Sequence, residues 1–393
     1  MEVAIVGGGP SAFYVASRLL LRVHVFDRLW APHGLVRYGG LPPLPGLSKT
    51  VQLGVDDIRQ NYSHLVFATG CALPALHAAL LNSPWCMPAL GFVHWYTQHP
   101  SAPPPPALDT LTHVSLIGNG NVALDVARIP SHLRLLCSKS TTSPQPVHEV
   151  LPAALTVRHV DIIARRGPIN AAFTAKELRE LINLPDASMH PIEPSLLVPP
   201  DSRHPSAIAH SSTPRQRLSQ PLRSTPKTWA LEFFKSPIVS ASARSPATPF
   251  FDATLGHLRT QAGRILDKQG RVLHNVYASG WAANGAKGVL ATTMMDAYAV
   301  ADVVSGDIMN TEQVQISPSE QEFVMNLTPT DDEPPSLVGE ACAARRIITY
   351  ADWKRVDQEE IRRGELLGKE RERMDWEAAQ AFLWPEECEI LIC

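Results

Sequence analysis

The chain has 393 residues, of which 45% are hydrophobic and 19% charged, and its formal net charge is −3. This length allows two or three domains with sizeable cores, and the near-neutral charge argues against a general nucleic-acid-binding protein. No run of 18 or more apolar residues occurs, so we expect no membrane-spanning helix and at most peripheral membrane association.

The six cysteines lie far apart and form no CxxC pair. Their spacing argues against a zinc site or a redox-active dithiol and is typical of a reducing compartment. We therefore predict no metal site. Many of the 35 prolines fall in Ser101–Pro106 and in roughly 185–226, where the composition favours loops or disordered insertions.

The first expected element is a buried strand at Val3–Val6, which is rich in β-branched residues. It begins so near the N-terminus that it leaves no room for a targeting segment. We therefore expect either a cytosolic protein, or a sequence that represents the mature or an incompletely predicted form of the protein.

A glycine turn, Gly7-Gly8-Gly9-Pro10-Ser11-Ala12, follows this strand, and an apolar helical pattern follows the turn. Gly7 permits the tight turn, Gly9 allows the backbone to approach a pyrophosphate, and Ala12 allows close packing of helix and strand. The free N–H groups and the dipole of the helix N-terminus favour a phosphate there. The order strand, turn, helix predicts a dinucleotide-binding fold.

A second strand, Val23–Phe26, ends at Asp27, twenty residues after Gly7. A carboxylate at this place accepts hydrogen bonds from ribose hydroxyls and repels a 2′-phosphate. The first unit therefore favours the adenosine half of FAD or NAD over that of NADP. A further buried strand is expected from His64, ending in the small-residue turn Ala68-Thr69-Gly70.

The same pattern occurs again further along the chain. The expected strand Val114–Ile117 leads into Gly118-Asn119-Gly120-Asn121-Val122-Ala123 and a helical pattern. The next expected strand, Val160–Ile163, is followed by Arg165 and Arg166 in place of an acid. Guanidinium groups bind phosphate through paired, charge-assisted hydrogen bonds, so this unit favours NADPH over NADH.

These residues and several longer motifs resemble the NADPH–adrenodoxin (ferredoxin) reductase family. The matching segments are Gly34–Gly39, Gly120–Arg128, Arg165–Pro168, Ala172–Glu180, Ala278–Trp281, Gly288–Met294, and Asp352–Gly364 with Gly368-Lys369 near the C-terminus. They are scattered over most of the chain outside the proline-rich stretches.

The resemblance implies an α/β fold with two Rossmann-like dinucleotide-binding domains. The NADP-binding domain, 108–249 with its proline- and serine-rich insertions, would be inserted into a discontinuous FAD-binding domain. That domain would consist of 1–107 and of 250–393, which also holds the C-terminal helices.

The resemblance also implies the site residues. Ser11, Asp27 and Leu35 would line the FAD site, and Trp281, Gly288, Val289 and Leu290 would cover the flavin side. The NADPH site would comprise Gly118, Gly120, Asn121, Val122, Ala123, Arg165, Arg166 and Glu177, and Gly288 would touch both cofactors. NADPH would reduce the flavin, which would pass single electrons to a ferredoxin- or adrenodoxin-type iron–sulfur protein. This scheme requires no proton-donating side chain, so we name no catalytic residue. The resemblance points to the mitochondrial matrix or a face of the inner membrane.

The sequence departs from the family in two places. After Gly39, and again after Pro237, segments that carry strands of the family's fold are missing. Three interpretations remain open: an active minimal reductase, a degenerate relative that at most binds nucleotides or partners, and a faulty gene model.

Two other enzyme classes fit the residues less well. A glutamate synthase small subunit would carry cysteine clusters, and a disulfide reductase would carry a closely spaced cysteine pair. The chain has neither.

Overall fold

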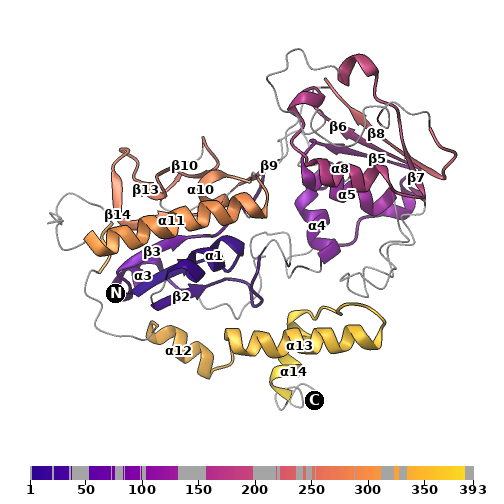
Figure 1. The fold of residues 1–393 in the computed structure, drawn as a ribbon. Helices are drawn as coiled ribbons and strands as arrows, with labels where there is room; N and C mark the ends of the chain where they lie inside the picture. Colours follow the sequence, from indigo (N-terminus) through magenta and orange to yellow (C-terminus); the bar gives the residue numbers. More distant parts are fainter. Residues whose placement is uncertain are drawn as a thin grey trace.

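The computed structural model describes residues 2–19, 22–34, 37, 53–71, 73–75, 83, 85–97, 99, 103–131, 156–197, 218, 222–235, 242–244, 250–252, 254–286, 288–310, 323–326 and 334–385. The described residues form two large β-sheets with helices packed against them, two short two-stranded sheets and a group of C-terminal helices (Figure 1). None of the described helices is long and apolar enough to cross a membrane.

The first sheet takes its strands from both ends of the chain, in the order β12-β13-β14-β3-β1-β2. Four of them are parallel neighbours: β14 (Val272–Ala278), β3 (His64–Phe67), β1 (Glu2–Val6) and β2 (Arg22–Phe26). Strand β13 (Arg264–Leu266) pairs antiparallel with β14 on one side and with the edge strand β12 (Thr260–Gln261) on the other. The strands expected at 3–6, 23–26 and from His64 are therefore confirmed. The fold also confirms that the first dinucleotide-binding unit is built from distant parts of the chain.

Helices cover both faces of this sheet, which is why its strands are apolar on both sides. Val3 and Ile5 of β1 pack with α1 (Pro10–Arg18) and α11 (Leu290–Asn310), whereas Ala4 faces the opposite cluster. That opposite cluster includes residues of α3 (Val55–Asn61) and α10 (Trp281–Asn284). A short hairpin of β10 (Phe251–Asp252) and β11 (His257–Leu258) adds Leu258 to it.

The second sheet is parallel throughout, in the order β5-β6-β8-β7. Its strands are β5 (His113–Ile117), β6 (His159–Ile163), β8 (Lys227–Glu232) and β7 (Ala187–Met189). Val160 and Ile162 of β6 are buried with Leu124 of α5 (Asn121–Ser131) and with Leu178 of α8 (Ala175–Ile182). The strands expected at 114–117 and 160–163 are confirmed.

Part of the proline-rich stretch is ordered against this sheet. Within 185–226, where we expected loops, the chain forms β7 and the 3-10 turn η5 (Pro194–Leu197). The expectation was wrong there because Ala187–Met189 are buried and pair with β8. The described residues 103–106 form neither helix nor strand, as expected.

The chain passes between the two sheets twice, and the two passages are hydrogen-bonded to each other. Strand β4 (Leu73–Ala75), on the way out, pairs antiparallel with β9 (Ser242–Arg244), on the way back. Between them lie α4 (Ala89–Thr97), the 3-10 turns η2 (Leu108–Thr110) and η4 (Pro168–Asn170), and the whole second sheet. The domain limits at 107 and 249 stay predictions.

The C-terminal helices, yellow in Figure 1, are α12 (Ser336–Ala343), α13 (Tyr350–Leu366) and α14 (Trp376–Leu383). Thr349 caps α13 and forms a reciprocal capping box with Asp352. Glu360 of α13 is fully buried and forms an ion pair with Arg37, at 2.5 Å from Arg37 Nη2 and 3.0 Å from Nη1. This pair attaches α13 to the segment that follows β2.

Candidate dinucleotide sites

The first glycine turn lies tightly against the neighbouring strand β3. Gly7 has a φ of +109°, and a Cβ placed on it would lie 2.4 Å from the carbonyl oxygen of Ala68. No side chain fits there, so glycine is required. By contrast, no atom of the described residues lies within 4 Å of where a Cβ on Gly9 would be. That open space adjoins the start of α1, whose first N–H groups have no partner within the helix. The arrangement can therefore receive a pyrophosphate.

Asp27 lies beside this turn, at the carboxyl end of β2. Its Oδ2 accepts a hydrogen bond of 2.6 Å from the N–H of Gly8, and its Oδ1 accepts one of 2.9 Å from Leu29. The side chain is exposed. The carboxylate is thus held beside the turn, at the position where the sequence predicts an acid that binds ribose.

The C-terminal part of the first sheet closes over the same edge. The hydroxyl oxygens of Ser11 and Ser279 share a hydrogen bond of 2.6 Å across 268 positions of sequence. Gly280 has a φ of +63°, and a Cβ on it would lie 2.8 Å from Ser11 Oγ. Trp281 follows directly, and its carbonyl accepts a hydrogen bond of 3.1 Å from Cys71 Sγ. The turns after β1, β3 and β14 therefore meet at the carboxyl ends of parallel strands, where α/β folds bind ligands.

Gly288, Val289 and Leu290 lead into α11, which packs against α1. Gly288 has a φ of +86°, and the backbone N–H of Val289 donates to Thr292 Oγ1 at 3.0 Å. The side chains of Val289 and Leu290 are 39% and 49% exposed, so this apolar corner faces outward from the sheet. Their predicted contact with a flavin stays a prediction. Leu35 lies outside the described residues.

The second glycine turn repeats the first without its tight packing. Gly118 has a φ of +116°, and its N–H donates to the carbonyl of Ile163 at 2.9 Å. No atom of the described residues lies within 4 Å of a Cβ built on Gly118 or Gly120. Asn121 begins α5, and its Oδ1 accepts a hydrogen bond of 2.7 Å from the N–H of Thr174. Val122 and Ala123 form the first turn of the same helix.

Arg165 and Arg166 follow β6 at the same edge of the second sheet, and both are exposed. Within the described part of the chain, neither forms an ion pair with a carboxylate. Their guanidinium groups are therefore available to an anion at this edge.

Glu177 has a different environment from the one that the resemblance suggests. Its carboxylate forms an ion pair with Arg128, which also contacts Asp125 at 2.5 Å and Glu180 at 2.6 Å. Its role toward NADPH stays a prediction.

Comparison with known proteins gives this geometry its context. No protein-family model matches the chain. Rat mitochondrial NADPH:adrenodoxin oxidoreductase is 27% identical over 95% of this chain and 89% of its own length. The Drosophila melanogaster protein of the same name is 29% identical over 95% of this chain and 91% of its own length. The chain resembles the NADPH:adrenodoxin oxidoreductases over almost its whole length. The resemblance inferred from the motifs is thereby confirmed.

A solved structure agrees with these relatives. Mycobacterium tuberculosis FprA in complex with NADPH is 25% identical, with a TM-score of 0.75, and the match covers 97% of this chain and 99% of that one. The predicted α/β fold with Rossmann-like units is confirmed. The alignment with the rat protein spans 475 positions, more than the 393 residues of this chain. The chain therefore lacks segments that its relative has, in line with the two departures seen in the sequence.

Sequence reasoning missed several residues that organise the first site. Asp296 of α11 accepts hydrogen bonds from the N–H of Gly280 at 2.7 Å and from Asn284 Nδ2 at 3.0 Å. Ser279 belongs to the Ala278–Trp281 motif, but its hydrogen bond with Ser11 joins positions too far apart in the sequence for a local pattern to predict it. An acid in the second turn of a long helix carries no signal of its own.

Proposed function

We propose that this chain is an FAD-containing NADPH oxidoreductase that passes electrons to a small iron–sulfur protein of the adrenodoxin or ferredoxin type. The names of its relatives and the NADPH-bound state of FprA support this function. FAD, when bound, would supply the conversion of a two-electron donor into single-electron transfers.

The observation that carries the proposal is the contrast between the two glycine turns. Each lies at the carboxyl end of a parallel strand, and each has free space at a glycine, Gly9 in the first turn and Gly120 in the second. The first turn has Asp27 beside it, and the second has Arg165 and Arg166. An acid suits a ribose without a 2′-phosphate, and two guanidinium groups suit a ribose that carries one.

The residues of this chain would bind and orient the two cofactors. Gly7, Gly9, Ser11 and Ala12 would hold the pyrophosphate of FAD, and Asp27 would hold its ribose. The residues proposed to cover the flavin side are Leu35, Trp281, Gly288, Val289 and Leu290. On the other sheet, the residues proposed to hold NADPH are Gly118, Gly120, Asn121, Val122, Ala123, Arg165, Arg166 and Glu177, with Gly288 reaching both cofactors.

We further propose a mitochondrial location, because the relatives are named mitochondrial. Within the organelle, the matrix or the matrix face of the inner membrane suits a reductase of a small soluble carrier.

The first test is the colour of the purified protein. An active reductase is expected to copurify with FAD, or to take it up, and to show flavin absorbance. It should reduce cytochrome c from NADPH only when a ferredoxin is added. A colourless protein that does not take up FAD would contradict the proposal and favour the degenerate or incomplete interpretation.

The second test addresses the arginines. The double variant Arg165→Ala/Arg166→Ala removes two charge-assisted contacts of about 1.5–3 kcal/mol each. We expect kcat/KM for NADPH to fall by about 100-fold or more, with kcat/KM for NADH nearly unchanged. Arg362→Ala, an exposed arginine of α13, is the control and should change neither. Equal losses with both nucleotides would show that the arginines do not read the 2′-phosphate.

A further inference from the structure

Two histidines begin neighbouring strands of the second sheet. They lie at the amino ends of these strands, whereas the glycine turn lies at the carboxyl ends. His113 opens β5 and His159 opens β6, and the register of the sheet pairs them with each other and His159 with Thr228. Gly118 lies at the far end of β5. At about 3.3 Å per residue, the histidines are roughly 13–17 Å from that turn. They are therefore outside the proposed NADPH site.

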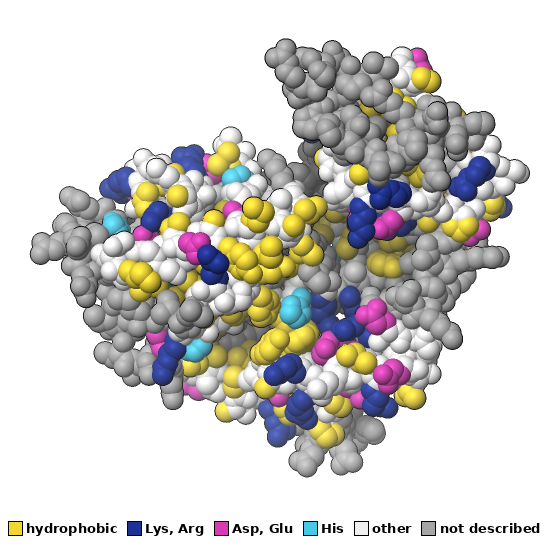
Figure 2. Space-filling model, viewed as in Figure 1, with side chains coloured by type: hydrophobic (Ala, Val, Ile, Leu, Met, Phe, Trp, Pro, Cys, Tyr) yellow, Lys and Arg dark blue, Asp and Glu magenta, His cyan; other side chains and the backbone are white. Residues whose placement is uncertain are grey.

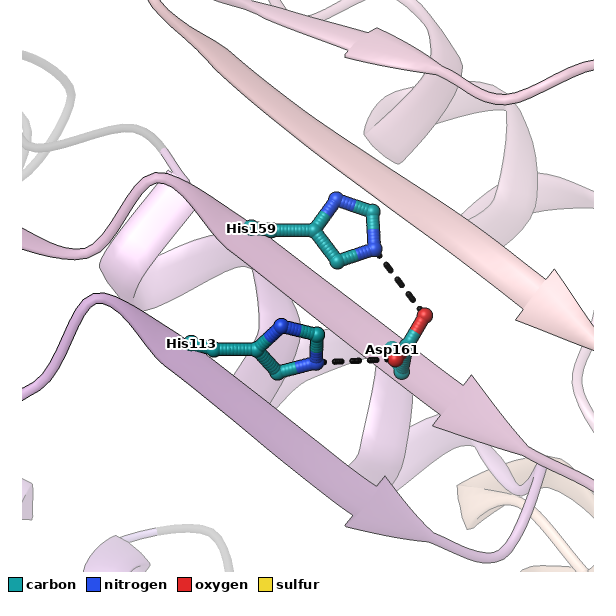
Figure 3. Close-up of side chains that lie close together, drawn as sticks. All are labelled: His113, His159 and Asp161. Atoms are coloured by element: carbon teal, nitrogen blue, oxygen red, sulfur yellow. Dashed lines mark hydrogen bonds and ion pairs between the residues drawn. The ribbon is translucent and has the colours of Figure 1, made fainter.

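The carboxylate of Asp161 bridges the Nε2 atoms of the two imidazole rings. Asp161 is two residues beyond His159 on the same strand, so both side chains leave the same face of the sheet. His113 Nε2 is 2.8 Å from one carboxylate oxygen of Asp161, and His159 Nε2 is 3.0 Å from the other (Figure 3). The ligand atoms of all three side chains lie within 4.8 Å of one another. Two imidazole nitrogens and a carboxylate thus converge on one small volume.

Neighbouring residues orient this cluster. The Nδ1 of His159 shares a hydrogen bond of 2.6 Å with Thr228 Oγ1, which leaves its Nε2 directed at Asp161. The ring of His190 packs edge-on against that of His159, with centroids 5.1 Å apart.

The cluster is also accessible. The side chain of His113 is 51% exposed, and those of His159 and Asp161 are 22% and 20% exposed. An ion can thus reach the three groups from solvent without any movement of the sheet.

We propose that His113, His159 and Asp161 form a binding site for a divalent transition metal ion of the zinc class, contrary to the expectation of no metal site that came from the cysteine spacing. Imidazole nitrogen combined with carboxylate oxygen is a donor set that zinc and its first-row neighbours prefer. Three protein ligands leave a coordination position for water. Thr228 is a positioning residue, because its hydrogen bond to the second nitrogen of an imidazole ligand fixes the ring.

The bound ion would link β5 to β6 at the amino ends of these two strands. An ion that binds only the folded protein stabilises it. The site would therefore act on the stability of the second sheet. It does not depend on the proposed reductase activity.

The test uses the full chain, freed of metal with a chelator and then titrated with Zn²⁺ and, separately, with Co²⁺. We expect one high-affinity equivalent of Zn²⁺ by calorimetry, a rise in the thermal midpoint, and visible absorption from bound Co²⁺. His113→Gln and Asp161→Asn should each weaken Zn²⁺ binding at least tenfold. Thr228→Val should weaken it by about tenfold, the lower range for loss of such a supporting contact.

His274→Gln is the matched control, because His274 is a partly exposed histidine on a strand of the other sheet. It should leave Zn²⁺ affinity unchanged. His113 is half exposed, so its variant is expected to fold, which circular dichroism checks. NADPH binding should be unaffected in His113→Gln, because the second glycine turn lies at the carboxyl end of β5 and His113 lies at its amino end. Zn²⁺ binding that is absent, or equally strong in the wild type and in His113→Gln, would overturn the proposal.

Discussion

The two glycine turns have the same backbone plan but different surroundings. The first is enclosed: Gly7 lies against Ala68, and Ser11 is hydrogen-bonded to Ser279, which arrives from the other end of the chain. The second is open, with no described atom near the Cβ positions of Gly118 and Gly120. The same strand–turn–helix unit therefore has two different environments, which depend on the other segments that the fold places beside it.

The two regions that contain these turns, the first region around the first sheet and the second region around the second sheet, also differ in the contacts that hold them together. The first region is fastened by the C-terminal helices through a buried ion pair, and Arg373 adds a hydrogen bond to the carbonyl oxygen of Arg37. In Figure 2, a notch separates the part of the surface that contains α11 from the part that contains the second sheet. The first region is thus held by long-range contacts, and the second by its own sheet.

The largest expected effect comes from removing the buried ion pair between Arg37 and Glu360. Glu360→Ala leaves the guanidinium group of Arg37, only 5% exposed, without its carboxylate. Loss of one partner of a buried pair costs about 3–5 kcal/mol. We expect the free energy of unfolding of the first region to fall by that amount in urea titrations followed by flavin or tryptophan signals. A variant as stable as the wild type would show that the C-terminal helices do not hold the first region.

Acid should also act on the first region. Burial of His64 lowers its pKa to about 4, so the folded state resists protonation of this ring while the unfolded state, with a pKa of about 6.5, accepts it. Stability is therefore complete above pH 6.5 and falls as the pH drops toward 4, by up to about 3 kcal/mol at 1.4 kcal/mol per pKa unit.

The measurement is the free energy of unfolding at pH 7 and at pH 4.5, in the wild type and in His64→Gln. The variant should lose about 2–3 kcal/mol less than the wild type between these two pH values. His257→Gln, a partly exposed histidine, should behave like the wild type. Identical pH dependence in all three proteins would exclude His64 as the cause.

A matched pair of glycine variants compares the turns directly. Gly7 and Gly118 both have positive φ values, +109° and +116°. Alanine at either place carries backbone strain of about 1–3 kcal/mol. At Gly7 the added methyl group also collides with Ala68, and overpacking costs about 1–3 kcal/mol more. We expect Gly7→Ala to be about 2 kcal/mol less stable than Gly118→Ala and to lose FAD retention. Equal stabilities would mean that the first turn is as open as the second.

The smallest effect is expected at an exposed pair on the same region. Arg18 and Asp302 join α1 to α11 at 2.5 Å, with side chains 47% and 58% exposed. Solvent and salt screen such pairs, so Asp302→Ala should leave the urea midpoint unchanged within error. A marked loss of stability would indicate that the contact between α1 and α11 depends on this pair.

Much of the architecture could be predicted because its signals are local. Five short β-branched or apolar runs gave strands that the structure extends by one residue at most, and each glycine turn lies between a strand and a helix as expected. The two-residue strands β10, β11 and β12 escaped prediction because so short a segment shows no periodicity. Strand β7 was hidden by its proline-rich surroundings.

The sites were predictable to a smaller extent. Positions defined by backbone geometry, such as Gly7 and Gly118, follow from the motif. Contacts that depend on the tertiary fold do not, as with Ser11 and Ser279 or Asp296 and Gly280. The cluster of Figure 3 shows both cases. His159 and Asp161 stand at a spacing that puts them on one face of a strand, whereas His113 joins them only through the register of the sheet.

The pairing of β4 with β9 places the exit from the first region next to the point of return. The segment between them is thus a module with adjoining ends, which a linker of a few residues could replace. Removing it would leave every strand of the first sheet in place, and the excised module would keep its complete four-stranded sheet. The nucleotide specificity of one reductase could therefore be transferred to a related one by transplanting a single continuous segment, although the rest of the enzyme is built from two separate segments.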